Sequence, residues 1–283
     1  MTPTFRFAPS PNGRLHLGHA RSALLNEGLA RATGGRLLLR IEDIDRARCR
    51  PELEASLRAD LAWLGLGFDG PVRRQSERFE AYRAALADLR GRGLAYPCFC
   101  SRRAVAEAAG GRKDPDGAPL YPGTCRGLPD AIAAARIEAG APHAWRLDLD
   151  RALEAAPGPH PIRRFEPGGP ETVVPAEPRR WGDPVIGRRD APTSYHLAVV
   201  LDDADQGVTH VVRGADLLAA TDLHVLLQAL LGLPSPAYHH HALLRDAAGL
   251  KLSKSLGSEA LADLRDRGVT PEDIRAALGF DRG

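Results

Sequence analysis

Residues 6–19 read RFAPSPNGRLHLGH, and their pattern indicates the fold class of the chain. A short apolar strand runs into a turn rich in proline and glycine, and these turn residues end the strand. From Leu17 onward, Ala20 and Leu24 recur at helical spacing, so a helix begins directly after the turn. A strand that leads into a helix in this way is the opening unit of an α/β fold with a parallel sheet.

Two histidines stand at the start of the predicted helix. His16 and His19 are three residues apart and therefore lie on one side of the helix. Gly18 between them carries no side chain that would keep a flat ring away from the backbone. Helix N-termini attract anions, because their N–H groups are unpaired and the helix dipole is positive there. We therefore predict a phosphate site at this helix start, with room for an adenine over the glycine.

Lysine is rare in this chain and is concentrated in one place. It occurs three times against 35 arginines, and two of the three lie in KLSKS, residues 251–255. Arginine presents a rigid fork, whereas lysine can follow a phosphate as a mobile point charge. Lys251 and Lys254 are therefore candidate phosphate ligands. A solvated charged loop is the ordinary alternative for a lysine pair that stands alone.

The two motifs together resemble a known family. HLGH at 16–19 and KLSKS at 251–255 are similar to the HIGH and KMSKS signatures of class I aminoacyl-tRNA synthetases, in the same order. RIEDID at 40–45 and VRGADL at 212–217, with the opening RFAPSPNG, resemble the glutamyl branch of that class. The resemblance covers nearly the whole chain. It implies a Rossmann-type catalytic domain that forms an aminoacyl-adenylate from ATP, with Mg²⁺ accompanying the ATP.

The resemblance assigns site residues motif by motif. It implies that ATP is bound by His16, Gly18, His19 and Lys254. It implies that the catalytic residues are His16, His19, Lys251 and Lys254, which meet the charge that develops on the α-phosphate and on the departing pyrophosphate.

The amino-acid pocket is expected to hold opposite charges. A glutamate substrate presents two carboxylates and an ammonium, so arginines suit its acid ends and a carboxylate suits its amine. Arg6 and Arg213 each end a predicted strand, where ligands gather in open parallel sheets. The resemblance implies the full set of glutamate-binding residues: Arg6, Phe7, Ala8, Pro9, Ser10, Glu42, Tyr195 and Arg213.

The length of the chain after the KLSKS motif indicates which branch of the glutamyl family the chain resembles. After Ser255 only residues 259–283 remain in any ordered form, and a further domain typically needs roughly 50 residues. A full glutamyl-tRNA synthetase carries an anticodon-binding domain there. The chain therefore resembles the truncated paralogues, the glutamyl-queuosine tRNA(Asp) synthetases. This implies L-glutamate, ATP and queuosine-containing tRNA(Asp) as partners, with glutamate attached to the modified base in the anticodon loop.

Two other functions remain open from the sequence. One is a shortened glutamyl-tRNA synthetase that charges the 3′ end of tRNA(Glu), which demands an anticodon reader on another chain. The other is a catalytically silent paralogue that binds RNA or an amino acid. The intact residues His16, His19, Lys251 and Lys254 argue against the silent paralogue.

The texture of the chain predicts four parts. Residues 1–94 alternate apolar strands with helical segments and form the first half of the nucleotide-binding catalytic domain. Residues 95–184 are rich in proline and glycine and form a smaller insertion. Residues 185–258 form the second half with the KLSKS loop, and 259–283 a short helical tail. Within the second half, we expect buried strands at 194–201 and 208–212 and a helix over 216–231, positions set by apolar runs and periodicity.

The insertion carries three of the four cysteines. In a cytoplasmic chain disulfides are improbable, so zinc is the leading explanation for clustered thiols, and reduced structural cysteines are the alternative. Three cysteines leave one position of a tetrahedral site vacant. The family resemblance, with Cys-x-Cys followed by Tyr-x-x-x-Cys, implies one structural Zn²⁺ bound by Cys98, Cys100, Tyr121 and Cys125.

Composition excludes some classes of protein. With 283 residues, 43% of them hydrophobic, the chain can bury one substantial α/β core plus an insertion. It contains neither a signal peptide nor a run of roughly 20 apolar residues, so we expect a cytoplasmic protein without a membrane partner. A net charge of +2 does not imply a general electrostatic attraction to nucleic acid. No obligate protein partner is evident, and the run His239 to His241 has no assigned role.

Overall fold

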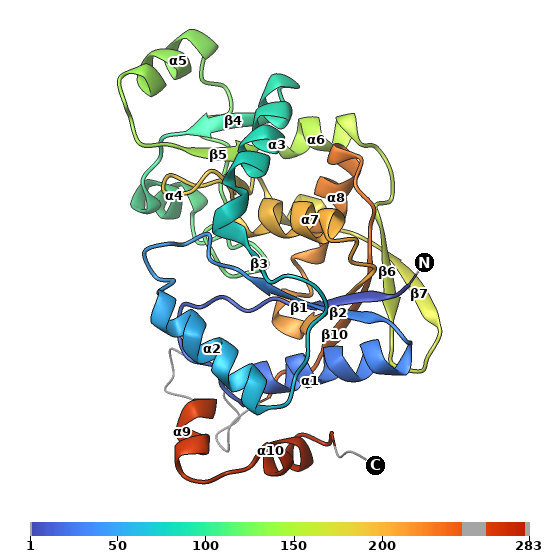
Figure 1. The fold of residues 1–283 in the computed structure, drawn as a ribbon. Helices are drawn as coiled ribbons and strands as arrows, with labels where there is room; N and C mark the ends of the chain where they lie inside the picture. Colours follow the sequence, from blue (N-terminus) through green and yellow to red (C-terminus); the bar gives the residue numbers. More distant parts are fainter. Residues whose placement is uncertain (1, 245–258, 281–283) are drawn as a thin grey trace.

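The computed structural model describes residues 2–244 and 259–280. Its centre is a parallel sheet with helices on both faces, as the opening stretch predicts (Figure 1). Strand β1 (Thr4–Phe7) pairs with β2 (Arg36–Ile41), which pairs with β3 (Arg73–Arg74), all in parallel. The four residues of β1 are buried and β2 is buried after its first residue, as expected for strands covered on both faces. The predicted α/β class with a parallel sheet is confirmed.

The second group of strands extends this arrangement. Strands β9 (His210–Gly214), β10 (Ala237–His241) and β6 (Pro161–Phe165) are parallel, and β7 (Glu171–Pro175) adds an antiparallel edge. The two groups meet where β1 lies beside β9, and the Thr209 amide donates to the Thr4 carbonyl at 3.0 Å. The carboxyl ends of β1, β2 and β9 therefore come together.

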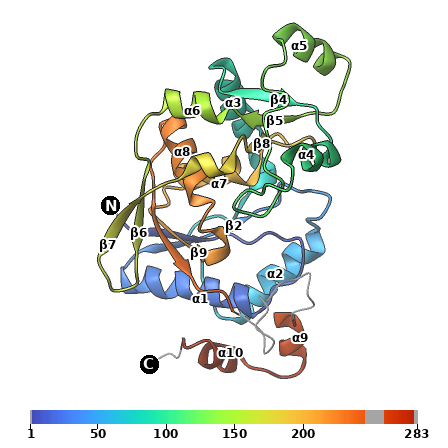
Figure 2. The same cartoon turned by 180° about the vertical axis from the view of Figure 1, so that it is seen from behind.

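Helices cover the two faces (Figures 1 and 2). Helices α1 (Leu17–Ala32) and α2 (Pro51–Trp63) lie on one side, and α7 (Tyr195–Asp205) and α8 (Thr221–Leu231) lie on the other. Helix α3 (Phe79–Gly91) packs its Leu86 and Leu89 into the same core cluster as α7 and α8. No helix in the described ranges is both long and apolar enough to cross a membrane.

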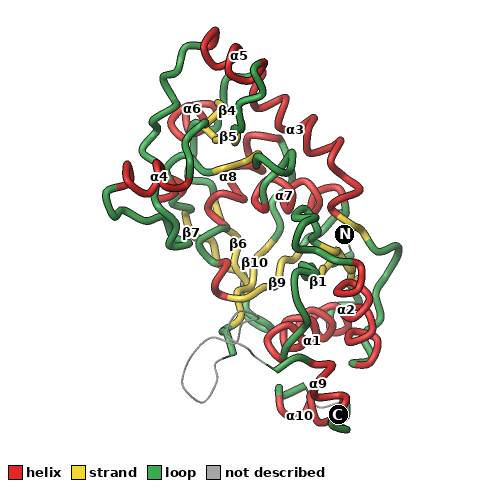
Figure 3. The backbone as a smooth tube through the Cα atoms, turned by 90° about the vertical axis from the view of Figure 1, so that its left-hand side faces the viewer, coloured by secondary structure: helices red, strands yellow, loops and turns green. Residues whose placement is uncertain are grey.

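A smaller antiparallel sheet lies at one end of the molecule (Figure 3). Its order is β4 (Ala95–Cys98), β5 (Ala144–Leu147), β8 (Val185–Gly187). The accompanying short helices are α4 (Arg102–Ala109), α5 (Asp130–Glu138) and α6 (Leu149–Ala155). The four-part division stays a prediction. Strand pairing crosses its boundaries: β6 and β7, from the predicted insertion, join β10, and β8, from the predicted second half, joins β5.

The tail consists of α9 (Leu261–Asp266) and α10 (Pro271–Ala277), which lie beneath α1 and α2 in Figure 1. Their Leu261 and Ile274 belong to the same core cluster as Leu15 and Leu57. Thr270 caps α10 and shares a reciprocal capping box with Asp273. The described ranges also contain three 3₁₀ turns: η1 (Gln75–Arg78), η2 (Pro178–Trp181) and η3 (Ala215–Leu217).

One predicted strand is wrong. The apolar run 194–201 is the cap and first two turns of α7, and the Ser194 hydroxyl accepts from the Leu197 amide. Such a run has no clear period, because a fully buried helix and a buried strand are both apolar throughout. The helix expected from residue 216 is α8, which starts at Thr221 because η3 occupies 215–217.

Candidate functional site

A cavity of about 740 Å³ opens at the carboxyl ends of β1, β2 and β9. Every residue that the sequence assigns to ATP or glutamate, and that the structure describes, lines this cavity: Arg6, Phe7, Ala8, Pro9, Ser10, His16, Gly18, His19, Glu42, Tyr195 and Arg213. Segments separated by up to about 200 residues thus form one concave site. Lys251 and Lys254 lie outside the described residues.

The helix start holds its two imidazoles in a fixed arrangement. The Gly18 amide donates to His16 Nδ1 at 3.1 Å, and the His16 amide donates to His19 Nδ1 at 3.2 Å. The ring centroids are 3.9 Å apart. Because both Nδ1 atoms accept, each neutral ring carries its proton on Nε2. The N-terminus of α1 therefore presents two N–H donors of the kind that suit phosphate oxygens.

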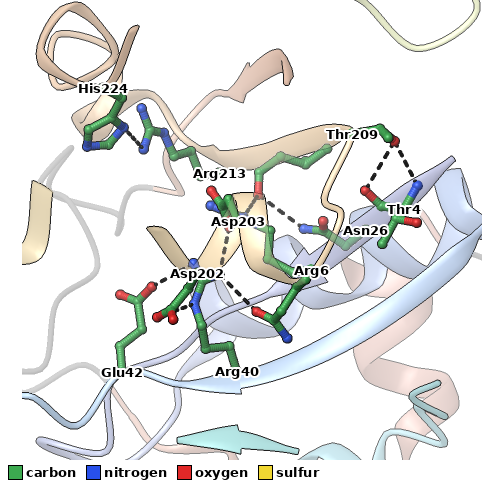
Figure 4. Close-up of polar contacts among 12 residues, drawn as sticks. Thr4, Arg6, Asn26, Arg40, Glu42, Asp202, Asp203, Thr209, Arg213 and His224 are labelled. Carbon is green, nitrogen blue, oxygen red and sulfur yellow. Dashed lines mark hydrogen bonds and ion pairs between the residues drawn. The ribbon is translucent and has the colours of Figure 1, made fainter. Parts of the chain in front are cut away.

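Buried charged partners hold Arg6 and Glu42, two of the residues assigned to glutamate (Figure 4). Arg6 Nε donates to Asp203 Oδ1 at 3.2 Å, and Arg40 Nη1 donates to the same oxygen at 2.6 Å. Arg40 Nη2 donates to Glu42 Oε1 at 3.1 Å. Asp203, on α7, thus connects to Glu42 through Arg40, a side chain with no exposed surface.

The pKa values of these acids move in opposite directions. Burial raises the pKa of Glu42, and the attraction of Arg40 and Arg6 offsets only part of the rise. Burial also acts to raise the pKa of Asp203, but Arg40 and Arg6 outweigh it and hold that pKa below its ordinary value. Asp203 therefore compensates the two arginines, while Glu42 is the carboxylate that gains most from a further cation.

Arg213 is surrounded differently. Its guanidinium donates to Thr221 Oγ1 at 2.8 Å, to His224 Nδ1 at 3.1 Å and to His240 Nε2 at 3.2 Å. A fourth contact, at 3.3 Å, runs to the Tyr195 hydroxyl. Within the described ranges no carboxylate oxygen lies within 4.0 Å of this guanidinium. The buried cation therefore lacks a charged partner there.

Sequence reasoning missed several residues of this site. The sequence marks Arg40 only as part of the motif RIEDID, although a charge inside the apolar run LLLRI signals a buried partner. It predicts His224 and Thr221 only as part of the helix over 216–231, and no local pattern marks them. Only the packing of α8 against β9 and β10 brings them to Arg213.

The cysteine cluster lies apart from this cavity. The sulfur atoms of Cys98, Cys100 and Cys125 all lie within 4.8 Å of one another, and Cys100 and Cys125 are 3.6 Å apart. A tetrahedral site with 2.3 Å Zn–S bonds has S–S edges of about 3.8 Å, so the three thiols fit a zinc ion. The Tyr121 hydroxyl is 3.8 Å from Cys100 Sγ and accepts from the Cys125 amide. The fourth cysteine, Cys49, lies next to Ser10.

Comparisons with known proteins agree with this geometry. Residues 4–280 match the family described as tRNA synthetases class I (E and Q), catalytic domain. The chain is 50% identical to the glutamyl-Q tRNA(Asp) synthetase of Rhodobacter capsulatus, over 97% of this chain and 99% of that one. It is 45% identical to the glutamyl-Q tRNA(Asp) synthetase of Symbiobacterium thermophilum, over 98% and 86% respectively.

A solved structure shows the same fold. The glutamate-tRNA synthetase of Elizabethkingia anophelis superposes with a TM-score of 0.73 at 29% identity, over 91% of this chain. The chain spans about half of that protein, 53% of its length. The match over residues 4–280 and the identity to full-length relatives place this chain in the family of class I tRNA synthetases for glutamate and glutamine.

Proposed function

We propose that this chain activates L-glutamate with ATP to glutamyl-adenylate and transfers the glutamate to the queuosine base in the anticodon loop of tRNA(Asp). The single observation that carries the glutamate assignment is the charge pattern of the cavity: Arg213 has no acidic partner among the described residues, and Glu42 is an acid whose pKa burial raises. A glutamate carboxylate and ammonium complement these two groups. Relatives named for the queuosine reaction match over 82–99% of their own lengths and support the acceptor.

The proposed mechanism uses position and charge. Arg6 and Arg213 bind the substrate carboxylates and Glu42 binds the ammonium, with Ser10, Tyr195 and the backbone of Phe7 to Pro9 completing the pocket. The N–H donors of His16 and His19 meet the phosphates as negative charge accumulates during adenylate formation. Gly18, which lies against the His16 ring, is assigned to ATP from the motif. We assign Lys251 and Lys254 to the pyrophosphate side from the motif alone, and Mg²⁺ accompanies the ATP.

The test separates activation from transfer. Glutamate-dependent exchange of pyrophosphate into ATP, measured without RNA, tests adenylate formation. Labelled glutamate is then offered with queuosine-containing tRNA(Asp), queuosine-free tRNA(Asp) and tRNA(Glu). Transfer only to the first supports the proposal. Transfer to the 3′ end of tRNA(Glu) instead makes the chain a glutamyl-tRNA synthetase, and an absence of exchange contradicts the enzyme altogether.

We further propose one structural Zn²⁺ on Cys98, Cys100 and Cys125, with Tyr121 as the fourth ligand. The close thiols support this assignment, because thiolates packed together repel one another without a cation. Metal analysis of the purified protein is expected to find about one zinc per chain. Cys100→Ser lowers that content, and Cys49→Ser, a cysteine outside the cluster, leaves it unchanged. Equal zinc in all three proteins contradicts the assignment.

A further inference from the structure

The contacts of Arg213 share one property, which is that every partner is uncharged. Two of the four partners are imidazoles, His224 from α8 and His240 from β10. Arg6, the other arginine assigned to the glutamate substrate, instead shares the Asp203 carboxylate. The two arginines assigned to glutamate are thus held by different chemistry.

The direction of the hydrogen bonds fixes the state of His224. A guanidinium only donates, so His224 Nδ1 accepts and carries no proton. The proton of the neutral ring is then on Nε2, which lies 3.3 Å from His196 Nδ1. His224 therefore donates to His196, and the chain of contacts runs from Arg213 through His224 to His196 on α7.

Burial keeps the imidazoles neutral. Burial, and then the charge of Arg213, lower the pKa of His224 well below its ordinary value. The same two causes lower the pKa of His196 to about 4 and that of His240 to about 3. Near neutral pH all three rings are acceptors or neutral donors, and none repels the guanidinium as an imidazolium.

The run of three histidines is explained by strand alternation. In β10 only His240 contacts Arg213, because successive side chains of a strand point to opposite faces. His239 Nδ1 lies 3.1 Å from the Phe165 carbonyl, and His241 Nδ1 lies 3.1 Å from that of Ala242. Of the three histidines, His240 therefore contacts the Arg213 side chain, and His241 lines the cavity.

We propose that His224, assisted by His240, is a positioning residue that orients the Arg213 guanidinium through a neutral acceptor and so keeps its positive charge available for a substrate carboxylate. A carboxylate in the same place would orient the guanidinium equally well, but it would also compete with the substrate for the charge. This inference rests on the proposed function, since it names how one arginine is kept ready for glutamate.

The test uses two variants of nearly identical shape. In His224→Asn the side-chain oxygen takes the place of Nδ1, and in His224→Asp the same position carries a negative charge. L-Glutamate binding is measured by calorimetry, and KM and kcat by pyrophosphate exchange. We expect the Asn variant to bind glutamate within about threefold of wild type, and the Asp variant to bind about tenfold or more weakly. The KM for ATP stays unchanged in both.

The binding results distinguish a positioning role of His224 from a role in packing alone. Equal weakening by Asn and Asp shows a role in packing alone and overturns the proposal, as does unchanged binding in both variants. The urea midpoint reports whether His224→Asp still folds. If it does not, a second pair, His240→Gln and His240→Glu, repeats the comparison at Nε2. Wild type that binds glutamate without exchanging pyrophosphate refutes the proposed function while the binding comparison still stands. Wild type that binds no glutamate overturns both.

Discussion

Gly18 is the second residue of α1 and lies against the His16 ring. A β-carbon at this position would lie 2.9 Å from His16 Cε1 and 3.0 Å from Nδ1, so the ring would have to move. The Gly18 amide also donates to that Nδ1. The glycine thus permits the ring position on which the proposed phosphate contact depends.

We expect Gly18→Ala to separate activity from stability. Alanine is favoured over glycine in helices by up to about 1 kcal/mol, so folding is not weakened by much. The displaced His16 ring loses its alignment, and kcat for pyrophosphate exchange falls by about tenfold or more. Gly28→Ala is the matched control, because the same helix has open space there. Equal activity of the two variants would refute this role of Gly18.

The protonation of the Glu42 carboxyl group can be followed through the pH dependence of glutamate binding. Its pKa is raised from 4.5, chiefly by burial. Above the raised value the carboxylate is charged and binds the substrate ammonium; as pH falls through that value the charge is lost. The KM for glutamate is therefore expected to rise as the pH is lowered from neutral, measured above about pH 5, where the side chain of free glutamate stays mostly ionised.

The control for this pH dependence is Glu42→Gln. The variant has no carboxylate to titrate, so its KM for glutamate is expected to be high and nearly independent of pH over the same range. Steady-state exchange rates at varied glutamate give both profiles. Parallel profiles in wild type and variant would assign the titration to another group.

Local patterns identify residues that act on their own segment and miss residues that act across segments. His16, Gly18 and His19 belong to one helix start, and their spacing suffices to place them together. His224 reaches the site only because α8 packs beside β9, so its role follows from tertiary structure. The direction of a side chain in a buried charge network is likewise set by partners far along the sequence.

At the scale of elements, the tail is fastened by buried charge as well as by apolar packing. Arg275 of α10 is 7% exposed and donates to Glu27 of α1 at 3.1 Å and to the Leu64 carbonyl at 2.8 Å. The Ala260–His16 bridge and the bond from the Leu261 amide to the Leu15 carbonyl join the other end of the tail to the start of α1. The tail thus supports the helix that carries the imidazoles.

Arg275→Met is expected to lower the free energy of unfolding by about 3 kcal/mol, because it leaves Glu27 buried with less compensation. Urea denaturation measures the change. Arg267→Ala, in the same tail, is the control: its pair with Glu259 is more than 40% exposed on both sides, so the loss stays below about 0.5 kcal/mol. Similar losses in the two variants would show that burial of the Arg275 pair contributes nothing.

The sequence distinguishes helix from strand where apolar residues recur with a clear period. It does not do so where a segment is buried on all sides. The helix after the opening turn has an apolar face and was predicted correctly. The run 194–201 is apolar on nearly all sides because α7 is enclosed by the sheet, α3 and α8, so its period is hidden. Enclosure is a property of the assembled fold, and it removes the signal that distinguishes helix from strand.

At the level of the whole molecule, one buried carboxylate contacts arginines from two strands that are far away in the sequence. Asp203 of α7 holds Arg6 of β1 and Arg40 of β2, residues 197 and 163 positions away in the sequence. The sequence predicted two halves around an insertion, but it did not reveal this connection. Pairing over such separations is set by how β1 lies beside β9, which no local pattern encodes.

Asp203→Asn therefore tests how much this carboxylate, which contacts both Arg6 and Arg40, stabilises the fold. The variant leaves two buried guanidinium groups with less negative charge, and we expect it to lose about 3 kcal/mol of stability at neutral pH. Because the folded-state pKa of Asp203 is lowered, its contribution is present above the unfolded pKa of about 3.9 and is lost as pH falls through the folded value. The gap between wild type and variant in urea midpoint is expected to narrow as the pH is lowered below about 4, since wild type then loses the charge that the variant already lacks.

Asp88→Asn, at an exposed pair with Arg92, changes the midpoint little at any pH. A gap that stays constant down to acid unfolding would show that Asp203 stabilises the fold by its shape and not by its charge.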